Sequence, residues 1–95
     1  MDHHFLLGGA KVLWRYTRLR GNAAGWSYLQ DAQHPRVLID LTLRGRALLE
    51  TEIHEAFHHL CPDHSEEHVT SAAKDLARIL WALGYRRTSK EKPDG

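Results

Sequence analysis

The first half of the chain alternates apolar and polar positions with the two-residue period of a β-strand. Residues 11–19 combine β-branched and aromatic side chains on one face with a mixed set on the other. A second alternating run covers residues 36–43, and residues 25–29 fit either a third short strand or an aromatic loop. The pattern therefore predicts two or three strands within residues 10–43.

After the second strand the apolar period changes to that of a helix. One stripe collects the apolar residues Leu49, Ile53, Ala56, Phe57 and Leu60. Pro62 then disfavours helical geometry at the residue before it. Ser65 is suited to cap a second helix, whose apolar spacing continues to Gly84. We therefore predict helices over residues 46–60 and 65–83.

These elements predict an α+β fold. In this fold a small two- to three-stranded antiparallel sheet packs on two antiparallel helices, because the loop between the helices is short. We expect a single domain over residues 1–86. Residues 87–95 are mostly charged or polar and end in Lys-Pro-Asp-Gly, which is typical of a flexible charged tail.

Composition narrows the class of protein. The 95 residues carry a formal net charge of +1 and one cysteine, which argues against a disulfide framework and fits a reducing compartment. No apolar run approaches the roughly 18 residues of a transmembrane helix, and no secretory signal opens the sequence. We expect a cytoplasmic protein without a membrane partner. Eight histidines are an unusual number for this length, and five lie between positions 54 and 68.

The strongest chemical motif is His54-Glu55-Ala56-Phe57-His58, an HExxH sequence inside the first predicted helix. Two histidines four residues apart on a helix lie one turn from each other and can direct both imidazoles at one Zn²⁺. The glutamate lies about 100° around the helix. There it can reach a water held by the metal without ligating the metal itself. We therefore predict zinc bound by His54 and His58, with Glu55 as general base.

A catalytic zinc usually takes three protein ligands and leaves one position open. Glu67, Ser71 and Asp75 form a line on the second predicted helix, away from its apolar face, and Glu67 is its first strong ligand. We therefore take Glu67 as the third ligand. The alternatives that stay open are Asp75 and His64, followed by Glu66, His68 and Cys61.

The residues HEAFHH at 54–59 and EEHVTSAAKDLARILWALGYR at 66–86 resemble the small HExxH zincins of bacteria and phages, and most closely the gluzincin type. The resemblance covers roughly residues 36–86. It implies an HExxH helix antiparallel to a helix that carries a glutamate ligand, beneath a small sheet whose edge strand holds the substrate. The gluzincin pattern Glu-x-x-x-Asp is matched here only in part, by Glu67 with Ser71 or by Ser71 with Asp75.

Motif and resemblance together predict a zinc-dependent metallopeptidase, a hydrolase that cleaves a peptide or protein substrate with Glu55 as general base. If the strand over residues 36–43 lies at the sheet edge, it can pair with the substrate main chain. The first alternative is a non-catalytic zinc protein in which the metal staples the fold. A fourth ligand from His64, His68 or Cys61 would favour that alternative.

A nucleic-acid-binding module is a weaker alternative. Aromatic and basic side chains alternate on the first strand and its surroundings, an arrangement that can stack bases, but a local excess of charge this small is more typical of solvated strand faces. The residues concerned are Trp14 and Tyr16 with Arg15, Arg18, Arg20, Arg36, Arg44 and Arg46. Homodimer formation is compatible with the pattern, because a second copy would cover an open face of so small a domain.

Overall fold

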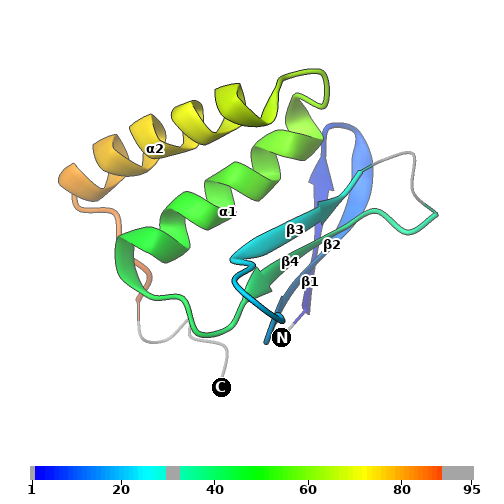
Figure 1. Cartoon of the computed structure of the whole chain (residues 1–95), viewed down its shortest axis with the longest axis horizontal. Coiled ribbons are helices and arrows are strands. Elements are labelled where there is room, and N and C mark those ends of the chain that lie inside the picture. The colour runs from blue at the N-terminus through cyan, green and yellow to red at the C-terminus, as the bar shows by residue number, and fades with distance from the viewer. Residues whose placement is uncertain (1, 30–32, 89–95) are drawn as a thin grey trace.

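The computed structural model describes residues 2–29 and 33–88 of the 95-residue chain. Four strands precede two helices. They are β1 (Asp2–Leu7), β2 (Ala10–Thr17), β3 (Gly25–Tyr28), β4 (Arg36–Asp40), α1 (Gly45–Leu60) and α2 (Glu66–Ala82). Figure 1 shows α1 lying between the sheet and α2, so that the molecule has three layers. The predicted α+β class is confirmed, and both helices begin and end within one residue of the predicted bounds.

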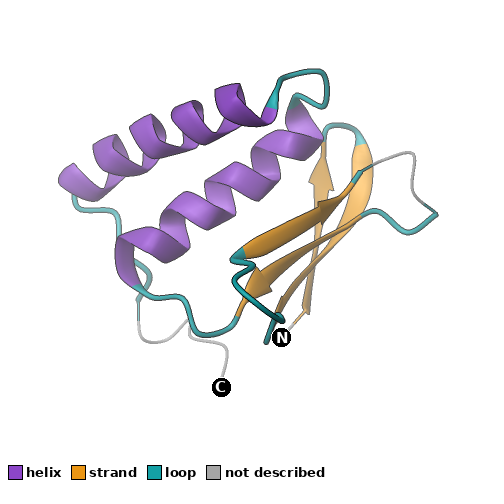
Figure 2. Cartoon of the chain, in the orientation of Figure 1, coloured by secondary structure: helices purple, strands orange, loops and turns teal. Residues whose placement is uncertain are grey.

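The sheet is mixed rather than antiparallel, and it has four strands instead of two or three. Its strand order is β1-β2-β4-β3. After β2 the chain passes over one strand position to form β3 and then returns to place β4 between the two (Figure 2). As a result β4 runs parallel to β2 and antiparallel to β3. The prediction of an antiparallel sheet was wrong because strand order depends on contacts between distant segments.

The strand missing from the prediction is β1, which forms an antiparallel hairpin with β2. Gly8 and Gly9 make the turn with φ values of 60° and 82°, which side chains other than glycine rarely adopt. Pairing places His3 opposite Trp14 and Phe5 opposite Val12, so these residues share the face that the helices cover. The His-rich sequence of β1 lacks a clear apolar alternation, which explains why the pattern alone did not reveal it.

The core lies between the sheet and α1. Val12, Val37 and Ile39 are fully buried, and Trp14 is nearly so. Leu48 and Ala56 of α1 pack against this cluster. The predicted alternation therefore holds for these four strand residues. The second predicted strand, over residues 36–43, ends earlier, because β4 stops at Asp40 and Leu41 is 44% exposed.

The sheet-facing side of α1 is more polar than the apolar stripe predicted. The two buried residues of α1 are Glu55 and His59, whereas Leu60 is 53% exposed. Burial lowers the pKa of His59 below its usual value, partly opposed by a hydrogen bond with the Arg36 backbone. Because α1 packs on two neighbours, the surface that meets the sheet includes only part of the predicted apolar stripe, such as Ala56.

Helix α2 begins as predicted, since the Ser65 hydroxyl accepts a hydrogen bond from the backbone N–H of His68 at 3.1 Å. The side of α2 that is buried consists of Val69, Ala73 and Ala77. Of the larger apolar residues, Ile79 is 49% exposed and lies beyond this narrow face. Small residues allow the backbones of α1 and α2 to approach closely.

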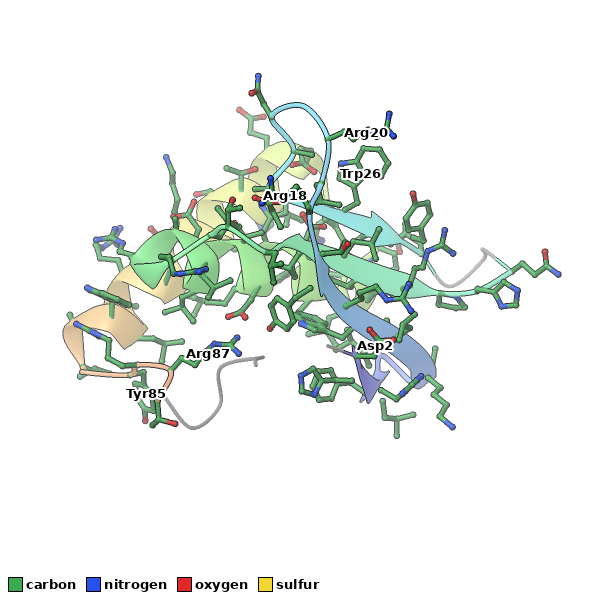
Figure 3. The ribbon with its side chains drawn as sticks, turned by 90° about the horizontal axis from the view of Figure 1, so that it is seen from below. Asp2, Arg18, Arg20, Trp26, Tyr85 and Arg87 are labelled. Atoms are coloured by element: carbon green, nitrogen blue, oxygen red, sulfur yellow. The ribbon has the colours of Figure 1, made fainter. Side chains whose placement is uncertain are left out.

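The segment after α2 does not begin a free tail at residue 87. Figure 3 shows Tyr85 and Arg87 on this segment, below the helices. Arg87 forms an ion pair with Glu52 and donates a hydrogen bond to the Tyr16 hydroxyl at 2.9 Å. The rest of the predicted tail, residues 89–95, lies outside the described residues. Within the described part of the chain, neither helix has the length and apolarity needed to cross a membrane.

Candidate metal centre

His54 and His58 lie one turn apart on α1 and point the same way. Their Nε2 atoms are 3.2 Å apart, and their rings meet edge to face. The two side chains are 18% and 21% exposed, so both are partly shielded but reachable from solvent. The geometry expected of the HExxH spacing is therefore present.

Glu66, the first residue of α2, completes the group. Its Oε2 lies 2.9 Å from His54 Nε2, and its Oε1 lies 2.9 Å from His58 Nε2. Glu66 precedes the buried Val69 by three residues, which directs it to the side of α2 that faces α1. Packing of the two helices thus brings a carboxylate onto both imidazoles.

Two hydrogen bonds to Glu66 do not by themselves account for this arrangement. If each Nε2 carried the proton needed to bond Glu66, two N–H groups would face each other across 3.2 Å. One cation between the three side chains removes this conflict, because each would then present a lone pair. Ligands about 2.05 Å from a tetrahedral Zn²⁺ lie about 3.3 Å apart. The 3.2 Å between the two imidazole nitrogens and the 2.9 Å between His54 Nε2 and Glu66 Oε2 are close to this value. The contact with His58 Nε2 at 2.9 Å is made by the other carboxylate oxygen, Oε1.

Among the described residues, His54, His58 and Glu66 are the group whose ligand atoms are close enough to hold a metal ion. Glu67, the predicted third ligand, is not part of it. The line of Glu67, Ser71 and Asp75 lies on the exposed side of α2, since the buried side is formed by other residues. Asp75 forms an ion pair with Arg78 at 3.1 Å instead of supporting a histidine.

Glu66 is the one alternative from the sequence analysis that belongs to the group, and the remaining ones, His64, His68 and Cys61, lie outside it. The rings of His64 and His68 stack edge to face on each other, with 4.6 Å between centroids, and both residues are exposed. Cys61 is a free thiol. Within the described residues the candidate group therefore consists of three side chains, and none of these alternatives joins it.

Glu55 lies beside the group without joining it. Its side chain is 7% exposed, and Ser27 Oγ donates a hydrogen bond to its Oε1 at 2.7 Å. Glu55 and the three ligands line one cleft of about 340 Å³. The remaining wall comes from β3 and the residue after it: Gly25, Trp26, Ser27 and Leu29. The predicted base therefore adjoins the metal-ligand group and shares its cavity.

Strand β4 is not the edge that the sequence analysis considered for substrate. It pairs with β2 on one side and β3 on the other, so its main-chain groups are occupied. The edge strand beside the cleft is β3. No pattern in the sequence indicated this role, because the segment is short and its pairing depends on β4.

Of the two aromatic residues considered for nucleic-acid binding, Trp14 is buried and Tyr16 is partly buried. Trp14 is 7% exposed and belongs to the core. The Tyr16 hydroxyl donates to Glu52 at 2.5 Å, and burial, followed by this bond, raises the pKa of Tyr16 above its usual value. The Trp14 ring is therefore not available to stack on a base, whereas the Tyr16 ring is half-buried and has the Arg87 guanidinium 5.2 Å from its centroid. Trp26, by contrast, is 51% exposed and projects from β3 (Figure 3).

Comparison of the chain with protein-family models, curated proteins and solved structures finds no match. Any functional conclusion must therefore come from the geometry of the site.

Proposed function

We propose that the protein is a zinc-dependent metallopeptidase that hydrolyses peptide bonds in the cleft between β3 and α1. The observation that carries the proposal is the convergence of three ligand atoms beside a buried carboxylate in one open cavity. His54, His58 and Glu66 would hold the ion. Glu66 replaces Glu67 in the predicted ligand set, because it is the carboxylate that reaches both histidines.

A zinc ion bound by these residues supplies Lewis acidity and lowers the pKa of a bound water towards about 7. Glu55 is the general base. It accepts the proton of the attacking water and passes it to the nitrogen of the leaving amine. The neighbouring position of Glu55, next to a ligand but outside the ligand group, supports this role.

The substrate is a peptide bound in extended form. As the edge strand, β3 leaves one side unpaired within the described sheet, and an added strand can pair with its main chain. Trp26 and Leu29 contribute apolar walls to the cleft. This supports a substrate with an apolar side chain beside the scissile bond.

The proposal is tested with protein purified without a nickel column. We expect about one zinc per chain by elemental analysis and cleavage of fluorescein-labelled casein. Glu55→Gln should retain the zinc and lose cleavage by at least about 100-fold, because it removes the base alone. Glu50→Gln is the matched control, since Glu50 is on the same helix but outside the cleft.

Two results would contradict the proposal. A folded parent protein that takes up no zinc would remove the metal centre. A Glu55→Gln variant that cleaves as fast as the Glu50→Gln control would show that Glu55 is not the base.

A second candidate function is a structural zinc site that stabilises the fold without catalysis. The observation that favours it is that the ligands come from both helices, so one ion would join α1 to α2. This function requires zinc for folding but leaves no role for Glu55, and the same variants separate the two functions.

A further inference from the structure

The buried carboxylate of Glu55 is held from the sheet by a single residue of β3. Ser27 Oγ donates to Glu55 Oε1 at 2.7 Å and also lies 3.0 Å from the Glu55 backbone oxygen. The bond joins residues 28 positions apart, so it exists only when β3 and α1 pack together. It fixes one of the two carboxylate oxygens, Oε1.

A second residue of β3 provides the room that this side chain occupies. A Cβ atom on Gly25 would lie 2.8 Å from Glu55 Cγ and 2.9 Å from Glu55 Oε2. It would also approach Thr51 Cγ2 to 3.0 Å. Distances under 3.0 Å are essentially never seen for real Cβ atoms, so any side chain at this position displaces Glu55.

The two β3 residues act on the same side of the strand. Gly25 pairs with Ile39 and Ser27 pairs with Val37, and both partners belong to the buried core that faces α1. Because alternate residues share one face of a strand, Gly25 and Ser27 both face Glu55. One leaves space for the carboxylate, and the other fixes one of its oxygens.

We propose that Ser27 and Gly25 are positioning residues that hold Glu55 in the orientation required for proton transfer. This inference rests on the proposed function and extends it to the strand that also borders the substrate. Ser27 anchors Oε1 so that the side chain does not rotate, while Gly25 allows the carboxylate to lie against the strand. A general base works only within hydrogen-bond reach of the proton it removes, so its orientation limits the rate.

A purely structural role for Ser27 is the competing explanation. A buried carboxylate needs a donor, and Ser27 would then serve folding alone. The two roles differ in what is lost when the hydroxyl is removed. A structural role lowers the melting temperature, whereas a positioning role lowers kcat in protein that remains folded and loaded with zinc.

The variants are Ser27→Ala, Ser27→Thr and Gly25→Ala, with Ser71→Ala on the exposed side of α2 as the matched control. Each is loaded with zinc, and its zinc affinity, melting temperature, kcat and KM for a casein-derived peptide are measured. We expect Ser27→Ala to keep zinc affinity within about twofold and KM unchanged, with kcat about 10- to 100-fold lower. Ser27→Thr should recover most of this loss because it retains the hydroxyl.

Gly25→Ala should lower kcat at least as far as Ser27→Ala, since the added methyl group displaces the whole side chain of Glu55. If Ser27→Ala does not fold, Ser27→Cys supplies a nearly isosteric side chain with a weaker donor, and an intermediate kcat is expected. A Ser27→Ala variant with unchanged kcat beside an inactive Glu55→Gln variant would overturn this inference and leave the proposed function intact.

Binding of acetohydroxamate to the zinc-loaded protein provides a readout that needs no catalysis. This probe ligates zinc and has a hydroxyl proton to share with Glu55. We expect about tenfold weaker binding in both Glu55→Gln and Ser27→Ala, equal to one charge-assisted hydrogen bond. If the parent protein cleaves no peptide, the proposed function fails. In that case unchanged acetohydroxamate affinity in Ser27→Ala overturns the inference, and weakened affinity supports it.

Discussion

Glu66 and Glu67 are adjacent glutamates in the first turn of α2, and only Glu66 belongs to the candidate metal-ligand group. Glu66→Gln and Glu67→Gln therefore form a matched pair. Both substitutions remove one negative charge from the same helix terminus and keep the size of the side chain. Any difference between them in zinc affinity reports on ligation.

The expected magnitude follows from the contacts. Glu66 Oε2 lies 2.9 Å from His54 Nε2, and Glu66 Oε1 lies 2.9 Å from His58 Nε2. The carboxylate is therefore within ligand distance of the same ion as both histidines. Loss of a residue that only supports a ligand costs about 10- to 100-fold in metal affinity. Loss of a ligand should cost at least the upper value, about 2.7 kcal/mol. Glu67→Gln removes only an exposed charge outside the ligand group, whose solvent-screened attraction to the ion is on the order of 1 kcal/mol, or less than about sixfold in zinc affinity.

The assay is competition for zinc with a chromophoric chelator, at fixed pH and ionic strength. We expect the affinity of Glu66→Gln to fall at least about 100-fold and that of Glu67→Gln to stay within about sixfold. Equal losses in both variants would show that charge rather than ligation is measured. A Glu66→Gln variant that binds zinc like the parent would refute the assignment of Glu66.

Two further predictions concern stability. The backbone N–H of Leu19, followed by the Thr42 hydroxyl, lowers the pKa of Asp40 below its usual value, so the folded state favours the ionised carboxylate. This stabilisation is present above the unfolded-state pKa of about 3.9 and is lost as the pH falls through the lowered folded-state value. The melting temperature of Asp40→Asn should therefore lie below that of the parent at pH 6, and the gap should narrow towards pH 3. Asp63→Asn, in the loop between the helices, is the control, and a gap that does not depend on pH would contradict the prediction. Removal of zinc with a chelator should lower the melting temperature, because an ion at about 1,000 times its dissociation constant stabilises the folded state by about 4 kcal/mol. In Glu66→Gln a 100-fold weaker affinity should reduce this loss to about 1.4 kcal/mol, and an equal loss in that variant would place the stabilising ion elsewhere.

The local features of this protein could be predicted from its sequence. The HExxH spacing places His54 and His58 on one side of a helix because the helical period is a property of neighbouring residues. The Ser65 cap is also a local feature, because the Ser65 hydroxyl bonds the backbone N–H of a residue only three positions later. The alternation that buries Val12 and Ile39 is likewise local, since it depends on the two-residue period of a strand.

The tertiary structure decided which segments meet. Rotation of α2 about its axis, set by the burial of Val69 and Ala73, selects Glu66 over Glu67. The spacing of Glu66 from those residues was visible in the sequence, but their packing partner was not. The insertion of β4 between β2 and β3 made the sheet mixed and left β3 as the edge beside Glu55. These features depend on contacts between segments far apart in the chain, and a periodic pattern describes only neighbours.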